Sequence, residues 1–425
     1  MPIALALVAL FPAACRRNSE RPNIVLIIVD ALRADHLPFY GYTEDTAPFL
    51  TELSANGSVF LHSYSSSNWT DPATGSIFTS LYPFQNRGLA SDPAAANGEE
   101  TEKPFQVSAI ADSVTTIAEV LKSAGYRTFG LSTNFFVSPQ RGYDQGFDFF
   151  HNFPMKTGAD IIHTQLAEWE GEMRRGPYFL FLHYTDIHIP YTRRAPWYKP
   201  GKNRAEDFIS AYDSNIPYLD AKIRTLYERL GWARDTMLIV TADHGEEFWE
   251  KGYRGHGHNL FNGSLRVPLL IRLPKGEGRG RRIEPNVSTI DILPTLSDYL
   301  GLKADPQFEG LSLLPAMRGN PDNLIGRPIY AYVERGRFRF RSILRDNWKL
   351  IMTPEGDRVF LFDLASDPDE KKNLANDGQE TDRQMEMARQ YRDFEKNSRK
   401  YEQKMVPMEY SRKQIEELKA LGYIH

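Results

Sequence analysis

NIVLIIVD, residues 23–30, is an apolar run that ends at a carboxylate. Two later runs have the same form: YFLFLHY at residues 178–184 and TMLIVTA at residues 236–242. A continuous apolar run of this length is typical of a strand that is buried on both faces of a parallel sheet. Helical patterns lie between the runs, so right-handed crossovers and helices on both faces are expected. The predicted fold class is therefore α/β, with a doubly wound, mostly parallel sheet.

Each of the three runs leads into residues that bind metals or transfer protons. The first ends at Asp30, the second precedes Asp186 and His188, and the third precedes Asp243 and His244. Ligands bind beyond the carboxyl ends of the strands in such sheets, so these side chains are expected to meet at one edge. A carboxylate with an imidazole suits zinc, manganese or another transition metal better than a harder ion. The alternative is that each aspartate only caps the helix or turn that follows it.

Length and composition limit the possible classes of protein. With 425 residues, the chain can hold one large α/β domain and a smaller appendage. Apolar residues make up 41% of the chain and charged residues 25%, which is ordinary for a globular protein. The formal net charge of -4 provides no basic field, so no nucleic-acid partner is expected. No apolar run reaches the length of about 20 residues that spans a bilayer.

Three segments are expected along the chain. Residues 1–20 are similar to an export signal, and residues 21–325 contain the alternating strands and helices, including a helical pattern within residues 205–230. From residue 326 the pattern changes to short strand-like pieces joined by turns, and a charged helical pattern follows over residues 381–421. Residues 326–425 therefore predict a small C-terminal antiparallel sheet and a helical tail.

The single cysteine of the chain, Cys15, follows a short apolar stretch that ends in Ala13 and Ala14. This order is similar to the lipobox of an export signal and implies a bacterial lipoprotein acylated at Cys15. The protein would then be exported, to the periplasm or the outer membrane, and associate with the membrane through that lipid. No basic residue precedes the apolar stretch and Pro12 is unusual there, so a membrane anchor or a disordered cytosolic tail is the alternative.

Thr70 is the candidate nucleophile. It begins TDPATGS, residues 70–76, which precedes the apolar run at residues 77–81. Pro72 is well placed in the first turn of a helix, and a helix N-terminus stabilises an alkoxide or a bound oxyanion. A threonine hydroxyl is a poor nucleophile at neutral pH, and metal coordination is one way to activate it. The alternative is that Thr70 only caps the helix.

Several ordered motifs resemble the sulfatase family of the alkaline-phosphatase superfamily. They are PNIVLIIVDALRADHL at residues 22–37, TADHGEEF at 241–248, GHGH at 255–258, LRVPLLI at 265–271 and LFDL at 361–364. The resemblance implies a metal-dependent hydrolase that cleaves sulfate or phosphate esters of small molecules, glycans or lipids. It also implies one divalent ion as cofactor: zinc, manganese or calcium.

The matched positions imply roles for four residues. Asp30, Asp243 and His244 would hold the metal, and Thr70 would be its fourth ligand and the nucleophile. Attack by Thr70 would give a covalent phospho- or sulfo-threonine, which is released to water or to an acceptor alcohol.

Other matched residues would assist the transfer. His188 would contact the transferred group or protonate the leaving oxygen, and His256 or His258 would share that work. For His256 and His258 the alternative is a purely structural role in the loop. A second metal on Asp186, His188 and His258 is a further alternative. Arg33 would anchor the site or form a structural salt bridge.

Several positions depart from the family pattern. Sulfatases carry Cys or Ser in a Cys/Ser-x-Pro-x-Arg motif that is oxidised to formylglycine, whereas this chain has Thr70 there and Thr74 in place of the arginine. Ala31 stands in place of a second aspartate, and Gly257 stands where a lysine is expected. Threonine cannot form the aldehyde and the cationic cradle is depleted, so phosphorus esters are favoured. The alternatives are a transferase of phosphorylated headgroups onto glycan or lipid, and an inactive binding protein that keeps the fold.

Overall fold

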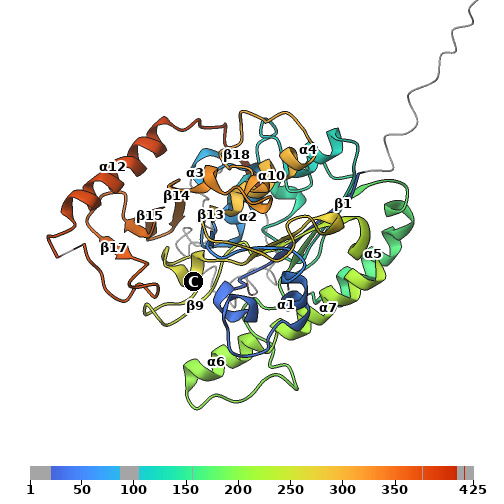
Figure 1. The fold of residues 1–425 in the computed structure, drawn as a ribbon, viewed down its shortest axis with the longest axis horizontal. Coiled ribbons are helices and arrows are strands. Elements are labelled where there is room, and N and C mark those ends of the chain that lie inside the picture. Colours follow the sequence, from blue (N-terminus) through green and yellow to red (C-terminus); the bar gives the residue numbers. More distant parts are fainter. Residues whose placement is uncertain (1–20, 87–104, 156, 376, 409–415, 417–425) are drawn as a thin grey trace, which may run out of the picture.

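An eight-stranded sheet forms the centre of the computed structural model, which describes residues 21–86, 105–155, 157–375, 377–408 and 416. The strand order is β12-β2-β11-β8-β1-β7-β5-β6, and β1 is labelled in Figure 1. In that order the strands are Arg281–Ile283, Ser58–Phe60, Leu269–Arg272, Thr236–Thr241, Asn23–Val29, Tyr178–Tyr184, Arg127–Ser132 and Phe149–Asn152. Neighbours pair in parallel except at β11, which is antiparallel to β8 and β2. The predicted doubly wound, mostly parallel sheet is confirmed.

Helices cover both faces of this sheet because side chains alternate between the faces along each strand. In β1, Val25 and Ile27 pack into one apolar layer, and Ile24 and Leu26 pack into the other. The first layer includes α1 (Pro48–Ser54), α5 (Ala159–Met173) and α7 (Ile216–Arg229). The second layer includes α2 (Thr70–Thr79), α4 (Ile117–Ser123) and α10 (Ile292–Tyr299). This alternation decides which face each residue at a strand end is nearest to.

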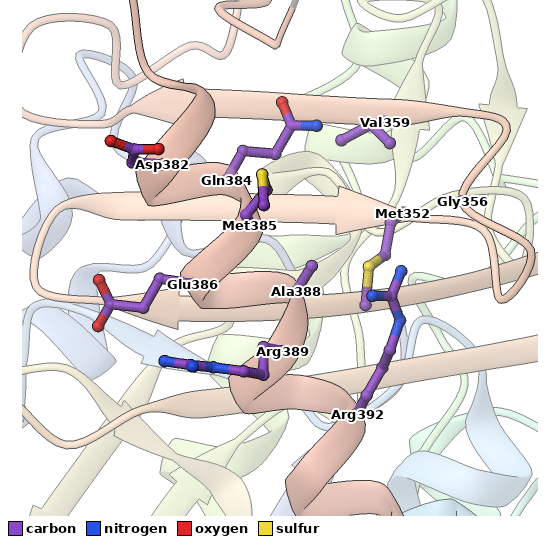
Figure 2. Close-up of a pocket in the computed structure, with 10 residues that line it drawn as sticks. All are labelled: Met352, Gly356, Val359, Asp382, Gln384, Met385, Glu386, Ala388, Arg389 and Arg392. Carbon is purple, nitrogen blue, oxygen red and sulfur yellow. The ribbon is translucent and has the colours of Figure 1, made fainter.

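A second, antiparallel sheet has the order β14-β15-β16-β17, so the predicted small C-terminal sheet is also confirmed. Its strands are Ile329–Arg335, Phe338–Arg345, Trp348–Met352 and Val359–Asp363. Helix α12, Thr381–Asn397, packs against one face through Met387 and Tyr391. Figure 2 shows a pocket of about 570 Å³ between α12 and this sheet. Met352, Met385 and Arg392 help to line it, and none of the candidate ligands does.

The end of the chain differs from the helical tail that was predicted for residues 381–421. Helix α12 ends at Asn397, and β18 (Lys404–Met408) then pairs antiparallel with β4 (Phe105–Ala109). Pro407 lies in β18 and has no N–H to donate, which disfavours a helix interior at this point. Cys15 and the predicted export segment lie outside the described residues. Within the part of the chain that the structure describes, no helix is long and apolar enough to cross a membrane.

The single helical pattern predicted within residues 205–230 is divided into two helices. Helix α6, Arg204–Asp213, ends before α7, and Pro217 lies in the first turn of α7, where its missing N–H is tolerated. The short helices are α3 (Pro83–Asn86), α8 (Trp232–Asp235), α9 (Asn262–Leu265) and α11 (Leu314–Met317). The short strands are β3 (Ser63–Tyr64), β9 (Glu247–Phe248), β10 (Arg254–Gly255) and β13 (Val287–Ser288).

Candidate metal centre

Asp30, His183 and Asp243 meet where β1, β7 and β8 end. β1 lies between β7 and β8, and each residue continues the alternate positions that face α2. One ligand atom from each side chain lies within 4.8 Å of the others, and all three side chains are fully buried. Among the described residues, this is the one group of at least three His, Cys, Asp or Glu close enough to share an ion. The strand ends therefore converge as the sheet topology requires.

The two carboxylates each have one satisfied oxygen and one oxygen without a partner. Asp243 Oδ1 accepts hydrogen bonds from the backbone N–H of His244 at 2.9 Å and of Ala31 at 3.3 Å. Asp30 Oδ2 accepts one from Asn134 Nδ2 at 2.7 Å. Asp30 Oδ1 and Asp243 Oδ2 are buried and have no hydrogen-bond donor among the residues that the structure describes. Two unpaired anionic oxygens away from water are costly, so this arrangement fits a bound cation.

Both imidazoles near these carboxylates present Nε2 to them. His244 Nδ1 lies 2.7 Å from the carbonyl oxygen of Gly245, so the proton is on Nδ1 and donates to that carbonyl. His183 Nδ1 lies 3.3 Å from Ser132 Oγ. His244 Nε2 lies 3.4 Å from Asp30 Oδ1, and His183 Nε2 lies 3.7 Å from Asp243 Oδ2. A second contact that fixes the tautomer in this way is a common feature of metal-binding histidines.

The pKa shifts of these side chains, in the absence of a cation, also indicate an excess of negative charge in the cluster. Burial raises the pKa of Asp30 to about 7, and repulsion from Asp243 adds to the shift. Burial also opposes ionisation of Asp243, but His244 and His183 outweigh it and hold the pKa of Asp243 well below its usual value. For His244, burial lowers the pKa, while Asp243 and Asp30 raise it and prevail. A divalent cation would supply the positive charge that these groups otherwise take from a proton.

Thr70 lies beside this cluster as the first residue of α2. Trp69, not Thr70, occupies the N-cap position, so the alternative of a threonine that only caps the helix is not what the structure has. Thr70 Oγ1 lies 3.3 Å from His244 Nε2 and 3.5 Å from Asp30 Oδ2. Asn134 Nδ2 is 3.4 Å from the same hydroxyl. The hydroxyl is therefore placed between a candidate metal ligand and an amide donor.

A buried ion pair fixes the backbone immediately after Thr70. Arg141 Nη1 lies 2.7 Å from Asp71 Oδ2, and both side chains are almost fully buried. The hydroxyl of Tyr143 donates to the carbonyl oxygen of Asp71 at 2.8 Å. These contacts tie the first turn of α2 to the segment after β5, which limits the freedom of Thr70 to turn away from Asp30.

His256 and His188 form a second layer next to the cluster. The ring of His256 lies 4.3 Å from that of His244 and 5.0 Å from that of His188, measured between centroids. His256 Nδ1 lies 3.0 Å from Glu246 Oε1, and His188 Nδ1 lies 2.6 Å from the carbonyl oxygen of Ile189. Burial lowers the pKa of His256 well below its usual value, so this ring is neutral at neutral pH.

His258, which was predicted beside His256, lies among aromatic rings. Its ring lies 5.6 Å from that of Tyr253 and 4.8 Å from that of Phe338, and it is partly exposed. Burial lowers the pKa of His258 to about 4.

The remaining predicted residues have structural partners. Asp186 Oδ1 accepts a hydrogen bond from Ala159 N at 3.2 Å, at the start of α5, and lies 3.6 Å from Arg194. Arg33 forms ion pairs with Asp35 at 2.7 Å and with Glu250 at 2.5 Å. Arg33 therefore forms structural salt bridges, which was the alternative interpretation of this residue.

The structure brings together the four residues predicted from sequence to share the metal, namely Asp30, Thr70, Asp243 and His244. It adds His183 and Asn134, which the sequence analysis did not single out. A signal for His183 was available, because it lies in the apolar run of residues 178–184 and occupies the same face as Phe179 and Phe181. Asn134 follows β5 in a loop and has no such signal.

Comparison with known proteins identifies the relatives of this chain. A family model described as Sulfatase matches residues 22–302, and one described as N-sulphoglucosamine sulphohydrolase, C-terminal, matches residues 252–397. Choline-sulfatase of Rhizobium meliloti (strain 1021) is 27% identical over 448 residues, covering 84% of this chain and 83% of that protein. N-acetylgalactosamine-6-sulfatase of Rattus norvegicus is 25% identical over 378 residues, covering 74% of this chain and 68% of that protein.

A solved structure supports the fold. The phosphonate monoester hydrolase of Agrobacterium radiobacter superposes with a TM-score of 0.70 at 19% identity, covering 87% of this chain and 94% of that one. This superposition shows a shared fold, and the family model and the sulfatase relatives indicate an ester hydrolase. The chain belongs to the sulfatase family of the alkaline-phosphatase superfamily.

Proposed function

We propose that this protein is a metal-dependent ester hydrolase in which Thr70 is the nucleophile, and that its substrates are phosphorus esters. One observation carries the proposal: Thr70 Oγ1 lies 3.3 Å from His244 Nε2 and 3.5 Å from Asp30 Oδ2 at the N-terminus of α2. The alternative substrate class is the sulfate ester, on which the named relatives act.

Asp30, His183, Asp243 and His244 would hold the ion. A divalent cation there supplies positive charge beside the Thr70 hydroxyl and beside the charge that develops on the ester. Asn134 Nδ2 donates to Asp30 and lies near Thr70, so it orients both oxygens. The N-terminus of α2 adds partial positive charge at the same point.

The reaction is a displacement in two steps. Thr70 Oγ1 bonds to the phosphorus as the ester bond breaks, and its proton passes toward Asp30 Oδ2, the acceptor at 3.5 Å. The leaving oxygen takes a proton from His188, an imidazole of the second layer. Water then attacks the phosphorus and gives a proton to the imidazole that protonated the leaving oxygen. The bond between phosphorus and Thr70 Oγ1 breaks, Thr70 recovers its proton from Asp30, and the acid product leaves.

The residue type at position 70 favours phosphorus over sulfur. A threonine cannot become the formylglycine on which the sulfatase mechanism depends, and Thr74 stands in place of the motif arginine. An alcohol nucleophile with a cation and a helix N-terminus is sufficient for in-line displacement at phosphorus.

The test is metal analysis of the purified protein together with rates on matched aryl esters. We expect bound divalent metal and faster cleavage of an aryl phosphodiester or aryl phosphonate than of the matching aryl sulfate. Preference for the sulfate would overturn the phosphorus assignment. Transfer to an added alcohol in excess of hydrolysis would indicate the transferase alternative, and metal-loaded protein that cleaves none of the esters would indicate a binding protein.

We also propose export and acylation at Cys15, on the sequence of the first 20 residues alone. Cys15→Ser should release the protein from membranes or stall its processing, which fractionation and intact-mass measurement would detect. Equal membrane association of both forms, with Met1 retained, would instead indicate an uncleaved anchor.

A further inference from the structure

The second sheet presents one face of β14 to the loops of the candidate site. Ile329, Ala331 and Val333 pack in the same apolar cluster as Trp69, which immediately precedes Thr70. Tyr330 and Tyr332 pack on the opposite face, in the cluster that contains α12. Because side chains alternate along a strand, Arg335 continues the series that faces Trp69.

Backbone contacts hold β14 against the segment that leads to Thr70. Tyr332 N donates to the carbonyl oxygen of Ser66 at 2.9 Å, and Ser67 Oγ donates to the carbonyl oxygen of Tyr332 at 2.8 Å. The loop of His256 is tied to the same segment, since Gly257 N donates to the carbonyl oxygen of Asn68 at 3.0 Å. The end of β14, the Thr70 segment and the His256 loop therefore meet in one place.

The guanidinium of Arg335 occupies that place. It lies 5.6 Å from the centroid of the Trp69 ring, and Nη1 lies 3.4 Å from the carbonyl oxygen of His256. Gly257 has a φ of 84°, and a Cβ at this position would overlap Arg335 Nη1. The positive φ disfavours a side chain at position 257, where the family resemblance calls for a lysine, and the guanidinium of Arg335 lies beside this glycine.

Arg335 also accounts for part of the charge state of its neighbours. After burial, its positive charge is the largest cause that lowers the pKa of His258, and it contributes to the lowered pKa of His256. A guanidinium remains charged at every working pH, so it can supply a fixed positive charge for an anionic substrate. Arg335 is only 7% exposed, so its charge is poorly screened by water.

We propose that Arg335 is a specificity-determining residue that binds an anionic oxygen of the ester, so that the second sheet supplies the fixed cation of the site. This proposal rests on the proposed function, which places the ester beside Thr70. Guanidinium groups bind tetrahedral oxyanions through paired N–H donors, which makes arginine suited to this task.

The test compares Arg335→Gln and Arg335→Lys with matched changes at Arg341. Arg341 is also 7% exposed and lies in the adjacent strand, where it pairs with Glu334 and with Glu395 of α12. Binding of inorganic phosphate and of sulfate to each metal-loaded protein is measured by calorimetry, and kcat and KM are measured on the aryl ester.

Arg335→Gln should weaken phosphate binding and raise KM by about 10- to 100-fold, the loss of one charged hydrogen bond. Arg335→Lys should recover part of that loss, and Arg341→Gln should change neither quantity. Unaltered phosphate affinity in Arg335→Gln, or wild-type protein that binds neither anion, would overturn the proposal. Arg335-dependent phosphate binding without turnover of any ester would support Arg335 while rejecting the proposed hydrolase. Thermal unfolding checks that each variant is folded.

Discussion

The large parallel sheet and the small antiparallel sheet contribute to the same site by different means. In the large sheet, strand order and direction bring Asp30, His183 and Asp243 to one edge. In the small sheet, Arg335 reaches the site because alternate residues of β14 pack against the Thr70 segment. The order and direction of the strands in the large sheet therefore place the residues that can hold a metal and perform the chemistry. Packing between the sheets places the residue that we propose recognises the substrate.

The largest effect is expected at Thr70, which lies beside the candidate metal ligands of the large sheet. Thr70→Ala removes the hydroxyl without removing a charged ligand, so kcat should fall by about 10⁴-fold or more. Metal content and the midpoint of thermal unfolding should stay as in the wild type. Thr70→Ser keeps a hydroxyl and should retain a measurable part of the rate. Wild-type turnover by Thr70→Ala would show that Thr70 is not the nucleophile.

The next largest effect is on metal binding, and it distinguishes two buried histidines that lie on opposite faces of the large sheet. His183→Ala removes a candidate ligand and should weaken metal binding by about 100-fold or more, since loss of an outer-shell partner alone costs 10- to 100-fold. His163 lies on α5, among the helices of the opposite face, and His163→Ala should leave metal binding unchanged. Elemental analysis after dialysis against graded chelator measures both. Equal metal retention in the two variants would exclude His183 from the site.

The smallest effect is the contribution of His163 to the pH dependence of the free energy of unfolding. Burial, together with the charges of Arg229 and Lys222, lowers its pKa to about 4. Between about pH 6.5, where the unfolded histidine titrates, and pH 4, the unfolded chain binds more protons, so stability falls as the pH falls. The loss should be about 1 kcal/mol, less than the full shift would give, because water screens part of the interaction. Denaturant unfolding at pH 7 and pH 5 should show a smaller pH dependence in His163→Leu than in the wild type.

Sequence reasoning reached the parts of the molecule that local patterns control. Apolar runs predicted the central strands, and the residues after them predicted Asp30, Asp243 and His244. His183 was not predicted as a ligand, although its alternation with Phe179 and Phe181 could be seen in the sequence. Its place beside Asp30 depends on the register that pairs it with Ile28.

Other features depend on contacts between distant segments. Arg335 is one of many arginines in the chain, and only the packing of β14 against Trp69 distinguishes it. The pairing of β18 with β4 similarly depends on tertiary contact, and residues 404–408 of the predicted helical tail form this strand. Asn134 was not predicted because its position depends on how the loop after β5 folds back to Asp30.

The central claim is that Thr70 carries the covalent bond of the reaction. The most direct measurement is rapid acid quench of the metal-loaded enzyme during turnover of an aryl phosphonate, followed by peptide mass spectrometry. We expect a phosphonyl adduct on the peptide that contains Thr70. The adduct should form at the same rate as the aryl alcohol is released, and it should be absent from Thr70→Ala. Turnover with the adduct on another residue, or an adduct of equal yield in Thr70→Ala, would contradict this claim.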